Sequence, residues 1–230
     1  MRLVLFDIDG TLLNSGGMGR AAMQKALGQI FGSPGNPSYR YDGKTDKQIV
    51  REVMRMEGHS DEHIDSRMEK LVGVYLDGLR EAAASGKFNI RPLEGIPEIL
   101  DALDNRDDVI LGLLTGNVEP GARIKLTAAG IDPDRFRINA FGSDHEHRPE
   151  LPAIARRRAG ETLGLDIAGD RVVVIGDTPA DIECGRSLGA KAIGVASGHY
   201  TVEQLEAHRP YAVFASLGDT GKVLASILNA

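Results

Sequence analysis

Short apolar runs recur along this 230-residue sequence, and helix-length segments separate the later ones. The runs cover residues 3–9, 109–115, 138–143, 171–177, 190–197 and 211–216. Runs of this length match buried strands, and strands that alternate with helices form a parallel sheet with helices on both faces. The sequence therefore predicts an α/β protein whose core is a Rossmann-like, doubly wound parallel sheet.

The alternation is interrupted between the first two runs. Roughly a hundred residues separate them, whereas the crossover between two parallel strands needs only about a dozen. Apolar residues recur at helical spacing in three parts of this gap, at 23–31, 49–54 and 64–79. We therefore predict an all-helical domain of residues 16–89, inserted into a core of residues 1–15 and 90–230. Its hinges are expected near Ser15–Gly17 and Lys87–Pro92.

The composition is that of an ordinary globular protein, with 42% apolar and 26% charged residues. A net charge of −6 argues against a nucleic-acid partner, because phosphate backbones attract basic surfaces. Cys184 is the only cysteine, which excludes an internal disulfide and fits a reducing cytoplasm. We expect a cytoplasmic protein without membrane association, since the sequence has no signal-peptide pattern and no long apolar stretch. The sequence leaves open whether the chain is a monomer or a homodimer.

Acidic and small polar residues follow three of the apolar runs. Asp7 and Asp9 end the first run, residues 115–117 (Thr-Gly-Asn) end the second, and Asp177 ends the fourth with Asp181 four residues later. Any one of these groups is also common in turns. The carboxyl ends of parallel strands, however, meet at one edge of the sheet, where open α/β sheets bind their ligands. The set as a whole therefore predicts one site.

These residues carry a resemblance to a known family. The segments "DIDGT", "LLTGN", a basic residue ahead of a helix, and "GDTPAD" occur in this order. In that order they resemble the haloacid dehalogenase superfamily, most closely its phosphoglycolate phosphatase-like members. The predicted helical insertion is similar to the helical cap of that family. The resemblance implies a sheet in which the first strand lies between the second and the fourth.

The chemistry of phosphate transfer explains why acids would crowd at this edge. A phosphate dianion repels a carboxylate nucleophile, and Mg²⁺ with oxygen ligands cancels that repulsion. Asp7 and Asp177 are the expected carboxylate ligands, and the resemblance adds the backbone carbonyl of Asp9. Asp7 would attack phosphorus, while a protonated Asp9 would protonate the leaving alkoxide. Asp181 would support the metal through water or orient Asp177.

Positive and neutral groups would then hold the phosphoryl oxygens. We expect Thr115 and the backbone N–H groups at Gly116 and Asn117 to bind them. The family usually places a lysine ahead of the helix that leads to the fourth strand, but none lies between Lys125 and Lys191. Arg148 precedes a predicted helix start and is the expected replacement. The neighbouring Arg156, Arg157 and Arg158 would fan out on a helix toward solvent.

The most favoured function is a phosphatase acting on a small phosphorylated metabolite, but others stay open. A sugar phosphomutase uses the same acid as Asp9, although it usually has valine where this chain has Thr11. A phosphonatase would need a lysine in the insertion, for which Lys44 qualifies. Lys44 is equally interpreted as a contact for an anionic substrate or as a surface residue. A receiver-like phospho-acceptor and a catalytically silent binding protein are the non-enzyme alternatives.

The assignment of Arg148 can be tested against an arginine of the following helix. We expect Arg148→Ala to lower kcat/KM for phosphate ester hydrolysis on the order of a hundredfold, because a cation beside the transferring group is lost. Arg148→Lys should keep part of the activity, since it restores the charge without the planar fork. Arg157→Ala is the control and should match wild type. An essential Arg157 with a dispensable Arg148 would contradict the assignment.

Overall fold

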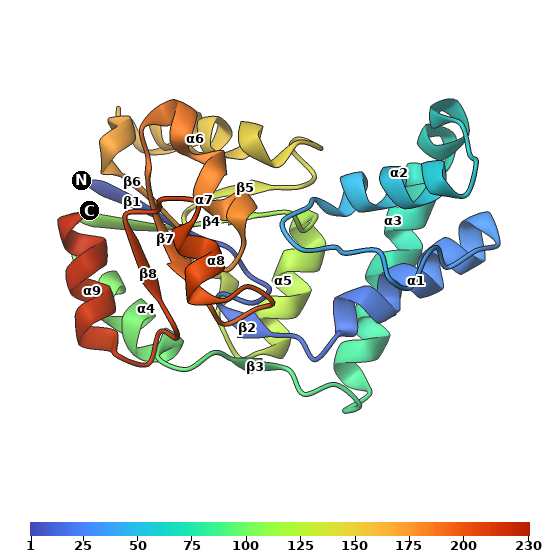
Figure 1. The fold of residues 1–230 in the computed structure, drawn as a ribbon, viewed down its shortest axis with the longest axis horizontal. Helices are drawn as coiled ribbons and strands as arrows, with labels where there is room; N and C mark the ends of the chain where they lie inside the picture. The colour runs from blue at the N-terminus through green and yellow to red at the C-terminus, as the bar shows by residue number, and fades with distance from the viewer.

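A six-stranded parallel sheet forms the centre of the molecule in the computed structural model, which describes all 230 residues (Figure 1). Its strands are β1 (Arg2–Phe6), β4 (Val109–Thr115), β5 (Ile138–Phe141), β6 (Val172–Gly176), β7 (Lys191–Val195) and β8 (Ala212–Phe214). They lie in the order β5-β4-β1-β6-β7-β8, and every neighbouring pair is parallel. The predicted strands, and the place of the first between the second and fourth, are therefore confirmed.

Helices cover both faces of this sheet. One face carries α4 (Ile96–Asp104), α5 (Glu119–Ala128) and α9 (Thr220–Asn229); the other carries α6 (Leu151–Leu163) and α7 (Pro179–Cys184). The side chains of β1 explain the arrangement, because they alternate between the faces. Val4 and Phe6 pack in the first apolar cluster, whereas Leu3 and Leu5 pack in the second. The predicted doubly wound α/β core is confirmed.

Shorter elements complete the core. The helix α8 (Val202–Glu206) packs beside β7 and β8. Single 3₁₀ turns occur at Pro133–Arg135, Arg148–Glu150, Gly169–Arg171 and Arg186–Leu188. Cys184 is buried in the second apolar cluster, where its side chain packs against apolar neighbours. Burial also raises the pKa of its thiol to about 12, which keeps it neutral.

Three helices between β1 and β4 form the insertion. They are α1 (Met18–Phe31), α2 (Asp46–Met56) and α3 (Asp61–Ala84), and they lie to the side of the sheet in Figure 1. Their apolar stripes meet in a separate cluster that includes Leu27, Val53 and Leu71. The three predicted helices are thus present, while the division into a core and a cap domain stays a prediction. No helix of the chain is both long enough and apolar enough to cross a membrane.

A two-stranded antiparallel ribbon joins the insertion to the core. It pairs β2 (Leu13–Asn14) with β3 (Arg91–Pro92). The sequence did not predict this ribbon, because strands of two residues leave no apolar pattern. A Cβ on Gly16 would lie 2.9 Å from the backbone nitrogen of Asn89, so the two connecting segments approach each other closely. The two predicted hinges therefore lie next to each other.

The close packing of strands β4 and β5 gives a test of the fold. A Cβ on Gly112, in β4, would lie 2.0 Å from the carbonyl oxygen of Ile138. We expect Gly112→Ala to destabilise the protein by about 1–3 kcal/mol, because the backbone must shift. Gly73→Ala is the control, since that helical glycine has no atom near its Cβ position and alanine favours helix by about 0.5–1 kcal/mol. Chemical denaturation should show a lower free energy of unfolding for Gly112→Ala and a higher one for Gly73→Ala. A Gly112→Ala protein as stable as wild type, or more stable, would contradict this close packing of β4 and β5.

Candidate active site

A cavity of about 520 Å³ lies between the carboxyl edge of the sheet and the helical insertion. Asp7 follows β1 directly, Thr115 is the last residue of β4, and Asp177 follows β6 directly. Because β1 is flanked by β4 and β6, these three residues meet at one edge. The sequence-predicted residues that line the cavity are Asp7, Asp9, Lys44, Thr115, Gly116, Asn117, Arg148 and Asp177. Asp181 lies behind this wall and is buried.

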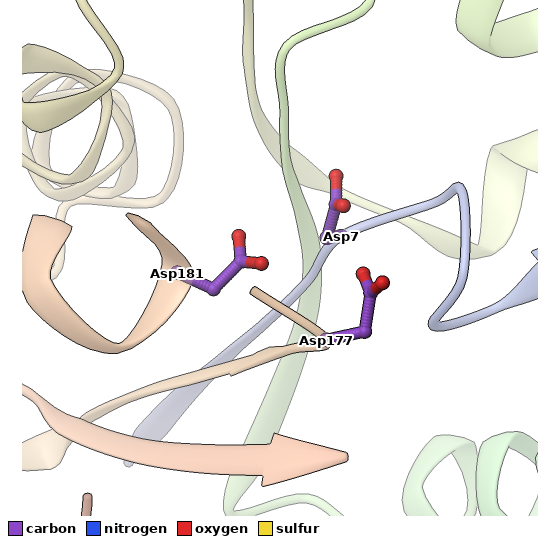
Figure 2. A group of neighbouring side chains, drawn as sticks. All are labelled: Asp7, Asp177 and Asp181. Atoms are coloured by element: carbon purple, nitrogen blue, oxygen red, sulfur yellow. The ribbon is translucent and has the colours of Figure 1, made fainter. Parts of the chain in front are cut away.

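Three carboxylates crowd together beside the cavity. Asp7, Asp177 and Asp181 each offer one oxygen, and these oxygens lie within 4.8 Å of one another (Figure 2). Burial and the neighbouring acids raise the pKa of Asp7 to about 6 and raise the pKa of Asp177 well above its usual value. The buried Oδ1 atom of Asp7 has no hydrogen-bond donor. A cluster of this kind suits a cation, which would remove the repulsion among the carboxylates.

Two glycines bring the backbone against Asp177. Gly10 has φ +80°, a left-handed conformation that glycine adopts readily, and a Cβ there would lie 2.4 Å from Oδ2 of Asp177. A Cβ on Gly198 would lie 1.9 Å from the same oxygen. Thr11 also donates a long hydrogen bond, 3.4 Å, to the other oxygen of Asp177. The carboxylate is therefore enclosed by backbone, and side chains at either glycine would displace it.

Arg148 is the buried cation beside the acid cluster. Its guanidinium forms an ion pair with Asp181 and lies 3.2 Å from Oδ1 of Asp7. It also donates to the carbonyl of Leu114, at the end of β4. The arginines of the following helix lie outside the cavity, and Arg157 is exposed and pairs with Glu161. Arg148 thus lies where the sequence predicted a positive charge.

The side chain of Asp181 is already engaged by protein groups. One oxygen pairs with Arg148, and the other accepts from the backbone N–H and the hydroxyl of Thr178 at 3.0 and 2.6 Å. The reciprocal bond from the Asp181 N–H to the Thr178 hydroxyl completes a capping box at the start of α7. Of the two roles expected for Asp181, this favours orientation of its neighbours over support of the metal through water.

Asp9 is held by three donors. Ser15 donates to Oδ1 at 3.1 Å, while Asn117 and Lys125 donate to Oδ2 at 2.9 and 2.6 Å. Burial raises the pKa of Asp9, but the Lys125 ammonium and these hydrogen bonds outweigh it, so the pKa lies below its usual value. The expectation that Asp9 starts out protonated does not hold in this arrangement. The physical reason is the lysine, a cation that the sequence analysis did not place in the site.

Lys125 is a buried lysine at the centre of the polar network. It projects from α5, is 4% exposed, and donates to Asn117 Oδ1 at 2.6 Å as well as to Asp9. The sequence did contain a signal for it. Ala122 and Ala129 are buried against the core, and Lys125 lies three and four residues from them, which places it on the same face of the helix. A lysine on a buried stripe needs an anionic partner, and Asp9 is that partner.

The turn after β4 connects these groups. Asn117 donates from its amide to the hydroxyl of Thr115 at 2.8 Å and to Asp9, so both strand ends share one network. Thr115 is fully buried and Asn117 nearly so. The backbone of this turn also contacts Asp46, at the start of α2. Sequence analysis missed Asp46, because an acid in the first turn of a helix is ordinary there.

Lys44 faces the cavity but is paired within the insertion. Its ammonium forms an ion pair with Glu52 and a 2.7 Å hydrogen bond with the hydroxyl of Tyr39. Burial lowers the pKa of Lys44, but these partners outweigh it and the pKa is raised. The structure therefore supports its position at the cavity, and it also shows that its charge is already balanced.

The fold and the acid-lined cavity define a hydrolase of the parallel α/β type with a helical insertion after the first strand. The chain belongs to the haloacid dehalogenase-like hydrolase family, whose sequence profile matches residues 4–195. It is 30% identical over 215 residues to an N-acetylmuramic acid 6-phosphate phosphatase of Pseudomonas aeruginosa, covering 90% of this chain and 87% of that one. It is 27% identical to a 5'-nucleotidase of the same organism, over 97% of this chain and 95% of that one.

More distant relatives agree with this assignment. A phosphoglycolate phosphatase of Aquifex aeolicus is 24% identical, with 83% of each chain covered. The crystal structure of a hydrolase from Pseudomonas syringae shares the fold with a TM-score of 0.73 and 24% identity, covering 99% of both chains. The resemblance found in the sequence motifs is confirmed.

Proposed function

We propose that this protein is a Mg²⁺-dependent phosphatase that hydrolyses a small phosphorylated metabolite through an aspartyl-phosphate on Asp7. The observation that carries the proposal is the placement of Asp7 at a cavity wall, between the acid Asp177 and the cation Arg148. A carboxylate that attacks a phosphate dianion needs positive charge beside it, which Arg148 supplies and which a cation held by Asp177 would add. Membership of a hydrolase family and the named phosphatase activities of three relatives support it.

Asp7 and Asp177 are the residues that would hold the metal, with the backbone carbonyl of Asp9. The donors are all oxygen, which suits Mg²⁺, and the buried Oδ1 of Asp7 accepts no hydrogen bond, although the Arg148 guanidinium lies 3.2 Å away. When bound, the ion supplies positive charge that neutralises the phosphoryl oxygens and returns the raised pKa of Asp7 toward its ordinary value. Asp181, whose oxygens are engaged elsewhere, would keep Arg148 in place.

The protein groups then perform a two-step displacement. A carboxylate oxygen of Asp7 attacks phosphorus in line, and the bond from phosphorus to the ester oxygen breaks. Asp9 protonates the departing alkoxide and then takes a proton from the water that attacks the aspartyl-phosphate. That attack breaks the acyl–phosphate link, releases inorganic phosphate and restores Asp7. Arg148, Thr115 and the turn at Gly116 hold the phosphoryl oxygens throughout.

The proton that Asp9 delivers requires a source, because the pKa of Asp9 is lowered in this arrangement. Lys125 donates a 2.6 Å hydrogen bond to Asp9 and is the adjacent group that carries a proton at neutral pH. The pKa of Lys125 is raised by its acidic neighbours, so the proton moves from the ammonium through Asp9 only as the ester bond breaks and the departing alkoxide becomes a strong base. The proton taken from water returns along the same path.

The alternatives are less well supported. A phosphonatase lysine forms an imine and needs a lowered pKa, whereas the partners of Lys44 raise it. A phosphomutase shares the core chemistry, so only product analysis separates it from a phosphatase. The names of the three relatives indicate three substrates: N-acetylmuramic acid 6-phosphate, 5'-nucleotides and phosphoglycolate. A cavity of about 520 Å³ has room for metabolites of this range.

Replacement of the nucleophile tests the proposal directly. Asp7→Asn is nearly isosteric and should lower kcat by at least about a thousandfold with p-nitrophenyl phosphate and Mg²⁺, because no covalent intermediate forms. Asp77→Asn, on the exposed face of α3, is the control and should match wild type. Released phosphate is the measurement, with EDTA to remove the metal. Turnover by Asp7→Asn near the wild-type rate would exclude the covalent mechanism.

The proton path through Lys125 predicts a dependence on the leaving group. Lys125→Met should lower kcat for alkyl phosphates on the order of a hundredfold, but far less for p-nitrophenyl phosphate, whose leaving group needs no proton. Lys87→Met removes an exposed lysine and serves as the control. Equal losses on both kinds of substrate would assign Lys125 a purely structural role.

A further inference from the structure

The first turn of α2 rests on the turn that follows β4. The backbone N–H of Asp46 donates to the carbonyl of Gly116 at 2.8 Å, and the backbone N–H of Val118 donates to the Asp46 carboxylate at 2.8 Å. Asp46 is 8% exposed. One residue of the insertion thus holds a carbonyl and an N–H on either side of Asn117, within the turn that is proposed to bind phosphate.

Two glycines allow this contact. A Cβ on Gly116 would lie 2.0 Å from the carbonyl oxygen of Lys44, and a Cβ on Gly142 would lie 2.0 Å from the carbonyl oxygen of Gly116. The three backbone segments therefore pack directly on one another without intervening side chains. Thr45 extends the contact, because its hydroxyl donates to the carbonyl of Glu146 at 2.7 Å.

The Asp46 side chain is not needed to cap its own helix. Thr45 is the N-cap of α2 and accepts from the backbone N–H of Gln48 at 3.1 Å. The Asp46 carboxylate is directed away from that helix to Val118, in the core. By contrast, Asp61 occupies the same first helical position in α3, after the N-cap Ser60, and its carboxylate pairs with Arg55 at the surface.

The charges around Asp46 link it to the catalytic network. The hydroxyl of Tyr75 donates a long hydrogen bond to it, 3.5 Å, and the nearby cation is Lys125. Lys125 in turn donates to Asp9 and Asn117. Asp46 is therefore the anion through which the insertion faces the lysine that holds the proposed acid.

We infer that Asp46 is a positioning residue of the active site, which fixes the phosphate-binding turn at residues 115–118 when the insertion lies against the core. This inference rests on the proposed function. The core alone leaves the N–H of Val118 and the carbonyl of Gly116 without these partners. A site completed by the insertion is fully formed only around a substrate small enough to let α2 reach the turn.

The test compares Asp46→Ala and Asp46→Asn with Asp61→Asn. Asp46→Ala should lower kcat for p-nitrophenyl phosphate and weaken binding of inorganic phosphate with Mg²⁺, measured by calorimetry, each by about tenfold or more, because a buried N–H loses its acceptor. Asp46→Asn keeps an acceptor oxygen and should recover most of both losses. Asp61→Asn should match wild type in both.

The outcomes separate this inference from the proposed function. If Asp46→Ala melts at a lower temperature but binds phosphate and turns over as wild type does, the residue is only structural and the inference is wrong. An Asn variant as impaired as the Ala variant also contradicts it. If wild type hydrolyses no phosphate ester yet binds phosphate, and Asp46→Ala weakens that binding, the inference stands and the proposed function fails.

Discussion

The repulsion among three buried carboxylates is the constraint on which the site depends. Asp7, Asp177 and Asp181 lie within 4.8 Å of one another, and burial raises the pKa of the first two. Such a cluster costs free energy unless positive charge compensates it. Arg148 supplies part of that charge from within the protein. A bound cation would provide the remainder, so the repulsion among the carboxylates and the proposed chemistry have the same origin.

The parallel sheet makes this crowding possible. Adjacent parallel strands end at the same edge, so β1, β4 and β6 deliver their polar ends to one place. The apolar residues that precede them are buried between two helical layers and hold the strand ends rigidly. Because Gly10 and Gly198 have no side chains, the backbone at these two residues can lie directly against the carboxylate of Asp177. Stability comes from the strand interiors, whereas the ends are free to carry polar groups that contribute little to the core.

The insertion does more than cover the cavity. Its apolar cluster makes α1, α2 and α3 a packed unit that also includes Val118 of the core, and its backbone rests on the turn after β4. Lys125 lies beneath this contact and is bonded to Asp9 and Asn117. The network around Asp7 reaches the end of β4 through Arg148 and the carbonyl of Leu114, and a second network, around Asp9, includes the following turn through Asn117. The second network is the one that depends on how the insertion lies.

The sequence by itself determined the parallel sheet and the acids at its edge, and the family resemblance added the place of the first strand between the second and the fourth. The apolar runs and segments such as DIDGT consist of residues that are adjacent in the sequence, so they can be recognised without the structure. The sequence also placed Arg148, because a helix start after a strand fixes where that residue lies. Only the tertiary structure decided the partners of Asp9, Lys44 and Asp46. Lys44 pairs with residues only five and eight positions away. Lys125 and Asp9, however, are 116 residues apart, and Val118 and Asp46 are 72 apart. A pairing of this kind, and the pKa that results from it, depends on packing between elements that no local pattern records.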